Sequence, residues 1–210
     1  MRPLPRLHAV TDAAILALPD FAVRAAALAA AGSAVALHAR DRTAGGARLA
    51  QVAGRLLALA RPPEAAVFVN ARPDIAAALG AQGVQLGRGD LAPGEVRAAF
   101  RPVWNGWIGA SVHSAEEAKE GAAAGADFLM VGNVYESVSH PGRAPAGLGL
   151  VTDAAATGLP VIAIGGITAE RAHEVRAAGG YGVAAISAAW QAEDPASAAL
   201  ALLAPWVEDT

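Results

Sequence analysis

The sequence predicts an α/β fold made of a single (β/α)8 TIM barrel, and three observations support this prediction. Eight short, mostly apolar runs recur along the chain, as expected for strands buried on both faces of a parallel sheet. Stretches with helical periodicity separate these runs, which indicates parallel strands joined by right-handed crossovers. No linker or change in composition divides the 210 residues, so we expect one domain over residues 1–210.

The eight expected strands follow one another at short intervals. They lie at residues 6–10, 34–38, 66–70, 83–86, 107–111, 128–132, 160–165 and 182–187. The expected helices include residues 20–31, 46–60, 93–99, 114–124, 168–178 and 195–206. An open doubly wound sheet is the alternative arrangement, but eight strand-and-helix units within 210 residues favour closure into a barrel.

Local signals mark the ends of several helices. Ser114 is a typical N-cap residue, and Glu117 follows it at the spacing of a capping box. Thr168 is also a typical N-cap residue, although Arg171 stands where a capping box has an acid. The sequences AGAD and AGGY place glycine where these two helices should end.

The composition excludes several classes of function. The absence of cysteine excludes disulfides, thiolate metal sites and a cysteine nucleophile. The net charge of −3 and the lack of a basic stripe argue against a nucleic-acid partner. No apolar run is unbroken enough to span a membrane and the first ten residues lack a secretory signal, so we expect a soluble, cytoplasmic protein. Lys119 is the one lysine, so an anion site must use arginine, backbone N–H groups or helix ends.

The strongest signal for a site comes from the ends of the last two expected strands. In a (β/α)8 barrel, ligands bind at the carboxyl ends of the strands, often with a phosphate near strands seven and eight. The sequence AIGGIT places Gly165 and Gly166 before a helix start, where glycine lets the backbone approach a ligand. Small residues after strand eight leave N–H groups near Ile186 and Ser187 open. We predict a phosphate site here, to which Ser139 contributes; two tight turns that only close the barrel are the alternative.

Polar side chains at the ends of the other strands would meet a ligand in the same mouth. The predicted substrate-binding residues are His38, Arg40, Arg42, Asn70, Gln85 and Ser111. Strand alternation directs Arg40 and Arg42 alike, so both could contact an anion, with ion pairs to nearby aspartates as the alternative. Arg72 and Asp74 are expected to form a surface ion pair, and His8 to be a hydrogen-bonded core residue.

Three residues are candidates for catalysis: His140, His113 and Asn133. His140 lies in the Gly- and Pro-rich loop 136–149, which could cover a ligand as a lid, and imidazole titrates near neutrality. His113 lies close to a helix start, and Asn133 follows the sixth expected strand. A solvated connector and a surface histidine are the alternatives for the loop and for His140.

Eight segments, taken in order, resemble one superfamily over nearly the whole chain. LHAVTD, HARDR, VNARPDIA, GVQLGRGDL, IGASVHSAEEA, GADFLMVGNVYES, PVIAIGGIT and GVAAIS resemble the thiamine-phosphate synthase/TenI superfamily. The resemblance implies a small (β/α)8 barrel that acts on a thiazole phosphate in thiamine biosynthesis.

In the synthase branch of this superfamily, a pyrimidine pyrophosphate is coupled to thiazole phosphate, and Mg²⁺ holds the pyrophosphate. This sequence departs from that pattern. Arg42 stands in place of a lysine, and Ala71 stands in place of a metal-ligating aspartate, while Asp90 remains at the second ligand position. Because a methyl group supplies no oxygen to Mg²⁺, we expect no metal site and no cofactor, except Mg²⁺ if the synthase alternative holds.

The TenI branch isomerises a thiazole carboxylate phosphate to its aromatic form without a metal, and LHAVTD, VQL, SVHSAEEA and VGNVYES resemble it more closely. Asn133 stands where that branch has a histidine acid/base, which leaves His140, His113 or Glu136 to move the proton. We expect a thiazole tautomerase, an isomerase, with His140 as the proton-transfer group. The alternatives are a thiamine-phosphate synthase, a transferase, and a non-catalytic protein that binds thiazole or thiamine phosphates. The sequence leaves open whether the chain forms homo-oligomers.

Overall fold

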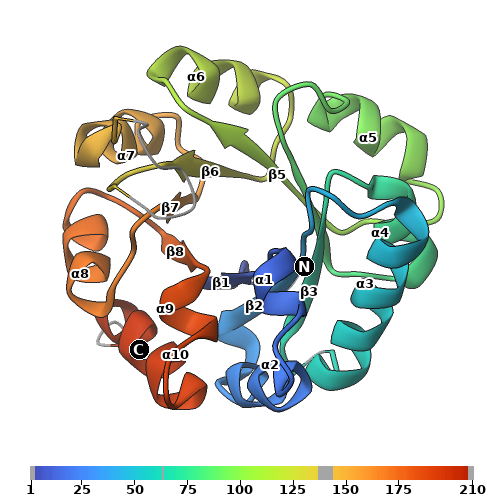
Figure 1. The fold of residues 1–210 in the computed structure, drawn as a ribbon. Coiled ribbons are helices and arrows are strands. Elements are labelled where there is room, and N and C mark those ends of the chain that lie inside the picture. Colours follow the sequence, from blue (N-terminus) through green and yellow to red (C-terminus); the bar gives the residue numbers. More distant parts are fainter. Residues whose placement is uncertain (1–2, 63, 137–143, 208–210) are drawn as a thin grey trace.

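Eight parallel strands form a closed barrel in the order β1 to β8, and β8 pairs with β1. The computed structural model describes residues 3–62, 64–136 and 144–207. Figure 1 shows the helices arranged around the outside of the barrel. The predicted (β/α)8 fold is confirmed. Within the described residues, no helix is long and apolar enough to cross a lipid bilayer.

Each strand begins and ends within two residues of its predicted position. The strands are β1 (Leu7–Val10), β2 (Val35–Ala39), β3 (Ala66–Asn70), β4 (Gly83–Leu86), β5 (Trp107–Val112), β6 (Phe128–Gly132), β7 (Val161–Ile164) and β8 (Gly182–Ala185). Almost every strand residue is buried, because the core lies on both faces of the sheet.

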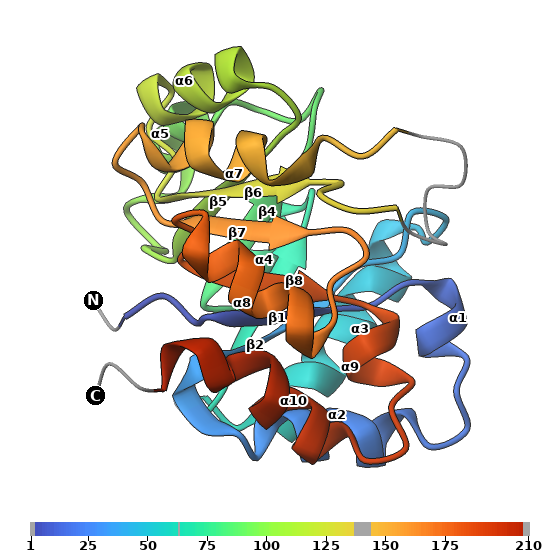
Figure 2. The same cartoon turned by 90° about the vertical axis from the view of Figure 1, so that its left-hand side faces the viewer.

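The helices include four that lie outside the six expected segments named above. The α-helices are α1 (Ala13–Leu16), α2 (Phe21–Ala29), α3 (Gly46–Ala60), α4 (Pro73–Leu79), α5 (Pro93–Phe100), α6 (Ala115–Ala123), α7 (Gly147–Ala155), α8 (Ala169–Ala177), α9 (Ser187–Trp190) and α10 (Pro195–Leu203). These four are α1, α4, α7 and α9; of these, α1 and α9 have four residues each, too few to show a helical period. Figure 2 shows α1 and α9 at the end of the barrel where the strands finish.

The predicted N-caps form, but the capping box does not. Ser114 Oγ accepts a hydrogen bond from the Glu117 N–H at 3.2 Å. The Glu117 carboxylate turns instead to the backbone N–H of His113, at 2.8 Å. Thr168 Oγ1 accepts from the Arg171 N–H at 3.3 Å, as predicted. The carboxylate that should close the box therefore holds the loop that leads into α6.

Aromatic rings fill the middle of the barrel, and glycines on neighbouring strands leave room for them. The ring centroids of His8 and Phe68 lie 5.3 Å apart, and those of Phe68 and Phe128 lie 5.9 Å apart. The strand register places Gly83 beside Phe68 and Gly109 beside Phe128. A Cβ at either glycine would lie 2.2 Å from the neighbouring ring. The barrel interior is therefore built from matched large and small residues.

We expect Gly109→Ala to destabilise the protein by about 1–3 kcal/mol, because the added methyl group overpacks the core. Urea unfolding followed by circular dichroism measures this change. Gly54→Ala is the matched control, since a Cβ at Gly54 in α3 would meet no atom within 4 Å. The control should be neutral or stabilising by up to about 1 kcal/mol, because alanine favours a helix over glycine. Equal effects of the two substitutions would contradict this account of the interior.

Candidate active site

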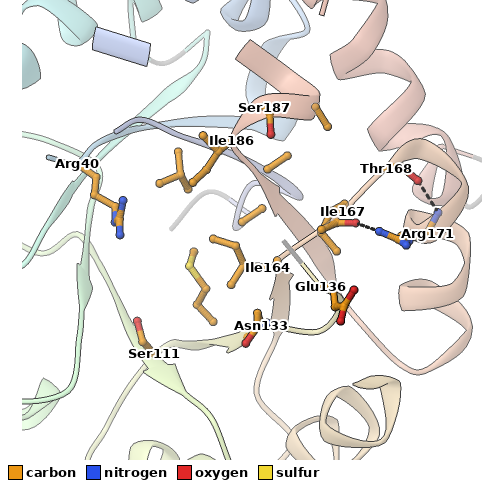
Figure 3. A pocket seen from close by; sticks show the side chains of 18 of the residues that line it. Arg40, Ser111, Asn133, Glu136, Ile164, Ile167, Thr168, Arg171, Ile186 and Ser187 are labelled. Atoms are coloured by element: carbon orange, nitrogen blue, oxygen red, sulfur yellow. Dashed lines mark hydrogen bonds between the residues drawn. The ribbon is translucent and has the colours of Figure 1, made fainter. Parts of the chain in front are cut away.

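A pocket of about 400 Å³ opens at the carboxyl ends of the strands. Its lining residues come from β1, β3, β5, β6, β7 and β8, from the segments that follow β2, β5, β6, β7 and β8, and from α8 and α9. Figure 3 shows Arg40 on one side of the cavity and Thr168, Arg171 and Ser187 on the other. The pocket therefore has two walls that differ in chemistry.

The first wall consists of backbone at the ends of β7 and β8. Gly165 and Gly166 have φ values of +104° and +65°, in the left-handed region that favours glycine. A Cβ at Gly165 would lie 2.5 Å from Asn133 Cβ, and one at Gly166 would lie 2.4 Å from the Glu136 carbonyl oxygen. Ser187 begins α9, so its N–H group lies in the first turn and has no acceptor within the helix. This wall presents backbone N–H groups, which suit a phosphate.

Side chains of α8 hold this wall in place. Arg171 Nη1 donates to the Gly166 carbonyl at 2.6 Å, and its guanidinium carbon lies 4.5 Å from the centre of the Tyr135 ring. The Tyr135 hydroxyl donates to Glu174 at 2.9 Å. Burial, the larger cause, and this bond to Glu174 together raise the pKa of Tyr135 to about 12. The phenol therefore stays a donor at neutral pH and ties the segment after β6 to α8.

The second wall contains the guanidinium of Arg40, just after β2. The backbone N–H of Arg40 donates to Thr11 Oγ1 at 2.9 Å, and the Thr11 hydroxyl lies 2.8 Å from the carbonyl oxygens of His38 and Arg40. Burial and the neighbouring Arg42 lower the pKa of Arg40. None of the ion pairs found among the described residues involves Arg40, so its charge is available to a ligand.

Arg42 does not face the pocket, contrary to the expectation that alternation directs it like Arg40. Arg42 is exposed and is not among the lining residues. The strand ends at Ala39, and the Asp41 carboxylate accepts from the Thr43 N–H at 2.9 Å in a turn. Because alternation holds only within a strand, it no longer applies at Arg42.

A floor of polar side chains lies between the two walls. Asn70 and Ser111 line the pocket. His38 and Gln85, also predicted to touch the substrate, are buried beneath these residues and do not line the pocket. His38 Nδ1 lies 3.0 Å from Asn70 Oδ1, and Gln85 Nε2 donates to Ser111 Oγ at 2.9 Å. The two buried residues therefore support the side chains that do face the cavity.

The candidates for catalysis have different outcomes. His113 and Asn133 line the pocket. His113 Nδ1 lies 3.2 Å from the Glu117 carboxylate, and Asn133 Nδ2 donates to the Tyr135 carbonyl at 3.3 Å. His140 and Ser139, with most of the proposed lid, lie outside the described residues.

Polar and apolar pocket residues were both missed by the sequence analysis as ligand contacts. Thr168 and Arg171 both line the cavity. Their signal was present, because they occupy the cap and the first turn of the helix that follows AIGGIT. Met130 and Ile164 add apolar contacts from strands β6 and β7, and nothing in their apolar runs distinguishes the residues that face the mouth.

The residues at the metal-ligand positions implied by the resemblance do not fit Mg²⁺. Ala71 offers no oxygen from its side chain, and Arg72 is engaged with Asp74 in the predicted surface ion pair, with Nε 2.8 Å from Oδ1. Asp90 is exposed, accepts from the Gly87 N–H at 2.7 Å and does not line the pocket. No cluster of three or more metal-binding side chains occurs in the described part of the chain. Hard-cation coordination needs a converging oxygen set, and these residues do not form one.

A closed (β/α)8 barrel with a pocket at the carboxyl ends of its strands defines a TIM-barrel protein. A family model described as thiamine monophosphate synthase matches residues 7–189, and the chain belongs to this family. This result confirms the superfamily that the sequence resembles.

Two named relatives and one solved structure are similar to the chain. The thiamine-phosphate synthase of Chromobacterium violaceum is 40% identical over 198 residues, covering 93% of each chain. A thiamine-phosphate synthase of Thermus thermophilus is 48% identical over 101 residues, so the match spans about half of each chain, 48% of this one and 47% of the relative. The solved structure of a thiamine phosphate pyrophosphorylase from Pyrococcus furiosus has a TM-score of 0.78 and 33% identity, and the match covers 97% of this chain and 96% of that one.

The comparisons overturn the expected tautomerase and isomerase assignment, because the two relatives are named as thiamine-phosphate synthases and the solved structure as a thiamine phosphate pyrophosphorylase. Some residues of the segments that suggested a tautomerase have structural roles. His8 of LHAVTD is fully buried in the barrel interior, and Ser114 of SVHSAEEA caps α6. Asn133, which replaces the tautomerase histidine, cannot titrate. The motifs therefore identify the superfamily, and the named relatives distinguish its branches.

We expect Gly166→Ala to weaken binding of inorganic phosphate by about tenfold or more, because its methyl group would displace the backbone of the first wall. Isothermal titration calorimetry measures the affinity. Gly80→Ala is the matched control: Gly80 has φ +67°, close to the +65° of Gly166, but a Cβ there would meet nothing within 4 Å. An equal loss in both variants would mean that backbone strain, and not the wall, causes the effect.

We expect protein stability to fall as the pH drops from 7 to 5. Burial lowers the pKa of His38 to about 4 from its usual 6.5. As the pH falls, His38 is therefore protonated in the unfolded chain before it is protonated in the folded protein. The stability present above pH 6.5 is lost as the pH falls towards 4. His38 alone should account for about 2 kcal/mol between pH 7 and pH 5. Urea unfolding of His38→Gln should show a smaller loss over the same range; an identical loss would contradict the assignment.

Proposed function

We propose that this chain is a thiamine-phosphate synthase, a transferase that couples a pyrimidine pyrophosphate with thiazole phosphate. The relatives named above support this function. The observation that carries it is the pair of facing walls in one pocket, backbone N–H groups on one side and the guanidinium of Arg40 on the other. Two separate anion sites suit a reaction between two phosphorylated substrates.

The backbone wall would hold the thiazole phosphate. Backbone N–H groups have a fixed position and lose no side-chain entropy when a ligand binds. Arg171 is already bonded to the Gly166 carbonyl, so it holds the wall in shape. A phosphate anchored there orients the thiazole ring towards the centre of the pocket, and this orientation lowers the entropic part of the barrier.

Arg40 would face the pyrophosphate of the second substrate. In the coupling, the bond between the pyrimidine-bearing carbon and the pyrophosphate oxygen breaks, and a carbon–nitrogen bond to the thiazole forms. Negative charge grows on the leaving pyrophosphate, and a partly buried guanidinium stabilises it more strongly than one in water. Neither the phosphate anchor on the backbone wall nor the charge stabilisation by Arg40 requires a metal ligand.

The decisive experiment supplies purified protein with both substrates, with and without added Mg²⁺. We expect thiamine phosphate and an equal amount of pyrophosphate to form. Chromatography measures both products. If the protein binds thiazole phosphate but forms no product under either condition, the chain is a non-catalytic binding protein and not a synthase. Neither binding nor product would exclude both functions.

We expect Arg40→Met to lower kcat/KM for this coupling by about 10²–10³-fold, the usual effect of removing a group that stabilises developing charge. Arg101→Met is the control, because Arg101 is exposed after α5 and does not line the pocket. The affinity for thiazole phosphate should stay unchanged in Arg40→Met, since that substrate lies on the other wall. A parallel loss of thiazole phosphate binding would contradict the division between the walls.

A further inference from the structure

A line of hydrogen bonds crosses the barrel interior and ends at the pocket. His8 Nε2 lies 3.1 Å from the Pro5 carbonyl oxygen, and His8 Nδ1 lies 2.8 Å from His38 Nε2. His38 Nδ1 lies 3.0 Å from Oδ1 of Asn70, which lines the pocket. Both imidazoles are completely buried. The line therefore connects the amino end of β1 with a side chain that can touch a ligand.

This arrangement requires one proton more than two neutral imidazoles carry. A carbonyl oxygen only accepts, so the ring nitrogens facing Pro5 and Asn70 must both be protonated. The short contact between His8 and His38 needs a third proton. Three protons on four ring nitrogens leave the pair with one positive charge.

The surroundings disfavour that charge. Burial and the nearby His38 lower the pKa of His8 well below its usual value. Burial is the largest cause that lowers the pKa of His38 to about 4; the bond to Asn70 opposes this shift, and the charge of Arg40 adds to it. The other close neighbours are the rings of Phe68 and Phe128, which supply no countercharge. At neutral pH the pair therefore holds two protons.

Only one neutral arrangement keeps all three hydrogen bonds. His8 donates from Nε2 to Pro5 and accepts at Nδ1 from His38 Nε2–H, which leaves His38 Nδ1 as an acceptor. Asn70 must then donate, so its amide turns and its oxygen faces the pocket. The opposite tautomers would place the bare His8 Nε2 against the Pro5 oxygen at 3.1 Å, and two buried acceptors would face each other without a proton.

We propose that His8 and His38 are positioning residues that set which end of the Asn70 amide the pocket presents. With two protons on the pair, Asn70 presents its oxygen and selects a ligand N–H group; with a third proton, it presents its NH₂ group and selects an acceptor. The identity of the ligand alone rests on the proposed function, under which the N–H group belongs to the pyrimidine substrate.

The first test is nitrogen-15 NMR of the imidazole rings in the free protein at pH 7. We expect both His8 and His38 to carry the proton on Nε2. A proton on Nδ1 of either ring would overturn the proposal. This result does not depend on any substrate, so it stands even if no thiamine phosphate is formed.

The second test uses His8→Phe, which keeps an aromatic ring but removes the acceptor for His38. A buried N–H without a partner is rarer than a bare acceptor, so we expect His38 to change to the Nδ1–H tautomer and donate to Asn70. His173→Phe is the control, because His173 is exposed on α8 and should leave the His38 tautomer unchanged. A folded His8→Phe variant in which His38 keeps the Nε2–H tautomer would contradict the proposed control of the His38 tautomer by His8.

The third test compares two probes, 4-aminopyrimidine and 4-methylpyrimidine, which differ in one hydrogen-bond donor. The unaltered protein should prefer the amino probe by about tenfold, the effect of one hydrogen bond. His8→Phe should remove this preference, while its affinity for inorganic phosphate stays unchanged. Equal affinity of the unaltered protein for both probes would overturn the proposal that Asn70 selects a hydrogen-bond donor on the ligand.

Discussion

The filling of a closed parallel barrel is the constraint on which the rest of this structure depends. Eight strands leave an interior that side chains must occupy completely, because empty space forfeits dispersion contacts. Phe68 and Phe128 supply much of that volume, and Gly83 and Gly109 remove the side chains that would collide with them. The register that this packing requires also determines where each strand ends. It therefore determines which residues meet at the mouth.

One of the interior rings is polar, and this has consequences at the pocket. His8 packs against Phe68 and Phe128 as a third ring, but both of its nitrogens need partners when buried. Pro5 and His38 provide them. His38 in turn needs a partner at its second nitrogen, and Asn70 is the side chain within reach. A requirement that begins in the core thus reaches the pocket through a chain of satisfied hydrogen bonds.

The sequence predicted the strands well because burial on both faces produces unbroken apolar runs. It predicted the glycine-rich first wall because positive φ and close approach leave a recognisable Gly165–Gly166 pair. It could not place Arg42, since strand alternation ends before that residue. The sequence also could not show that Asn70 lies in the floor of the pocket while His38 lies beneath it. The depth of these two residues depends on the barrel register and not on residue type. The reaction was misassigned because the quoted motifs combine packing residues such as His8 with pocket residues such as Asn133, and they do not separate the branches of the superfamily.

Ala71 shows how a backbone can keep a shape after its side chain has changed. Its φ of +62° lies in the left-handed region, which aspartate and asparagine enter more readily than alanine. The synthase pattern that the sequence resembles has an aspartate at this position, so the backbone has a conformation that suits the residue implied by the resemblance. Its N–H donates to the Gln85 carbonyl at 2.9 Å, which ties the turn to β4 whatever side chain it bears. Ala71 supplies no carboxylate and Asp90 is bonded to its own loop, so positive charge at this side of the mouth comes from Arg40, whose backbone is fixed through Thr11. Under the proposed function, this guanidinium would neutralise the pyrophosphate.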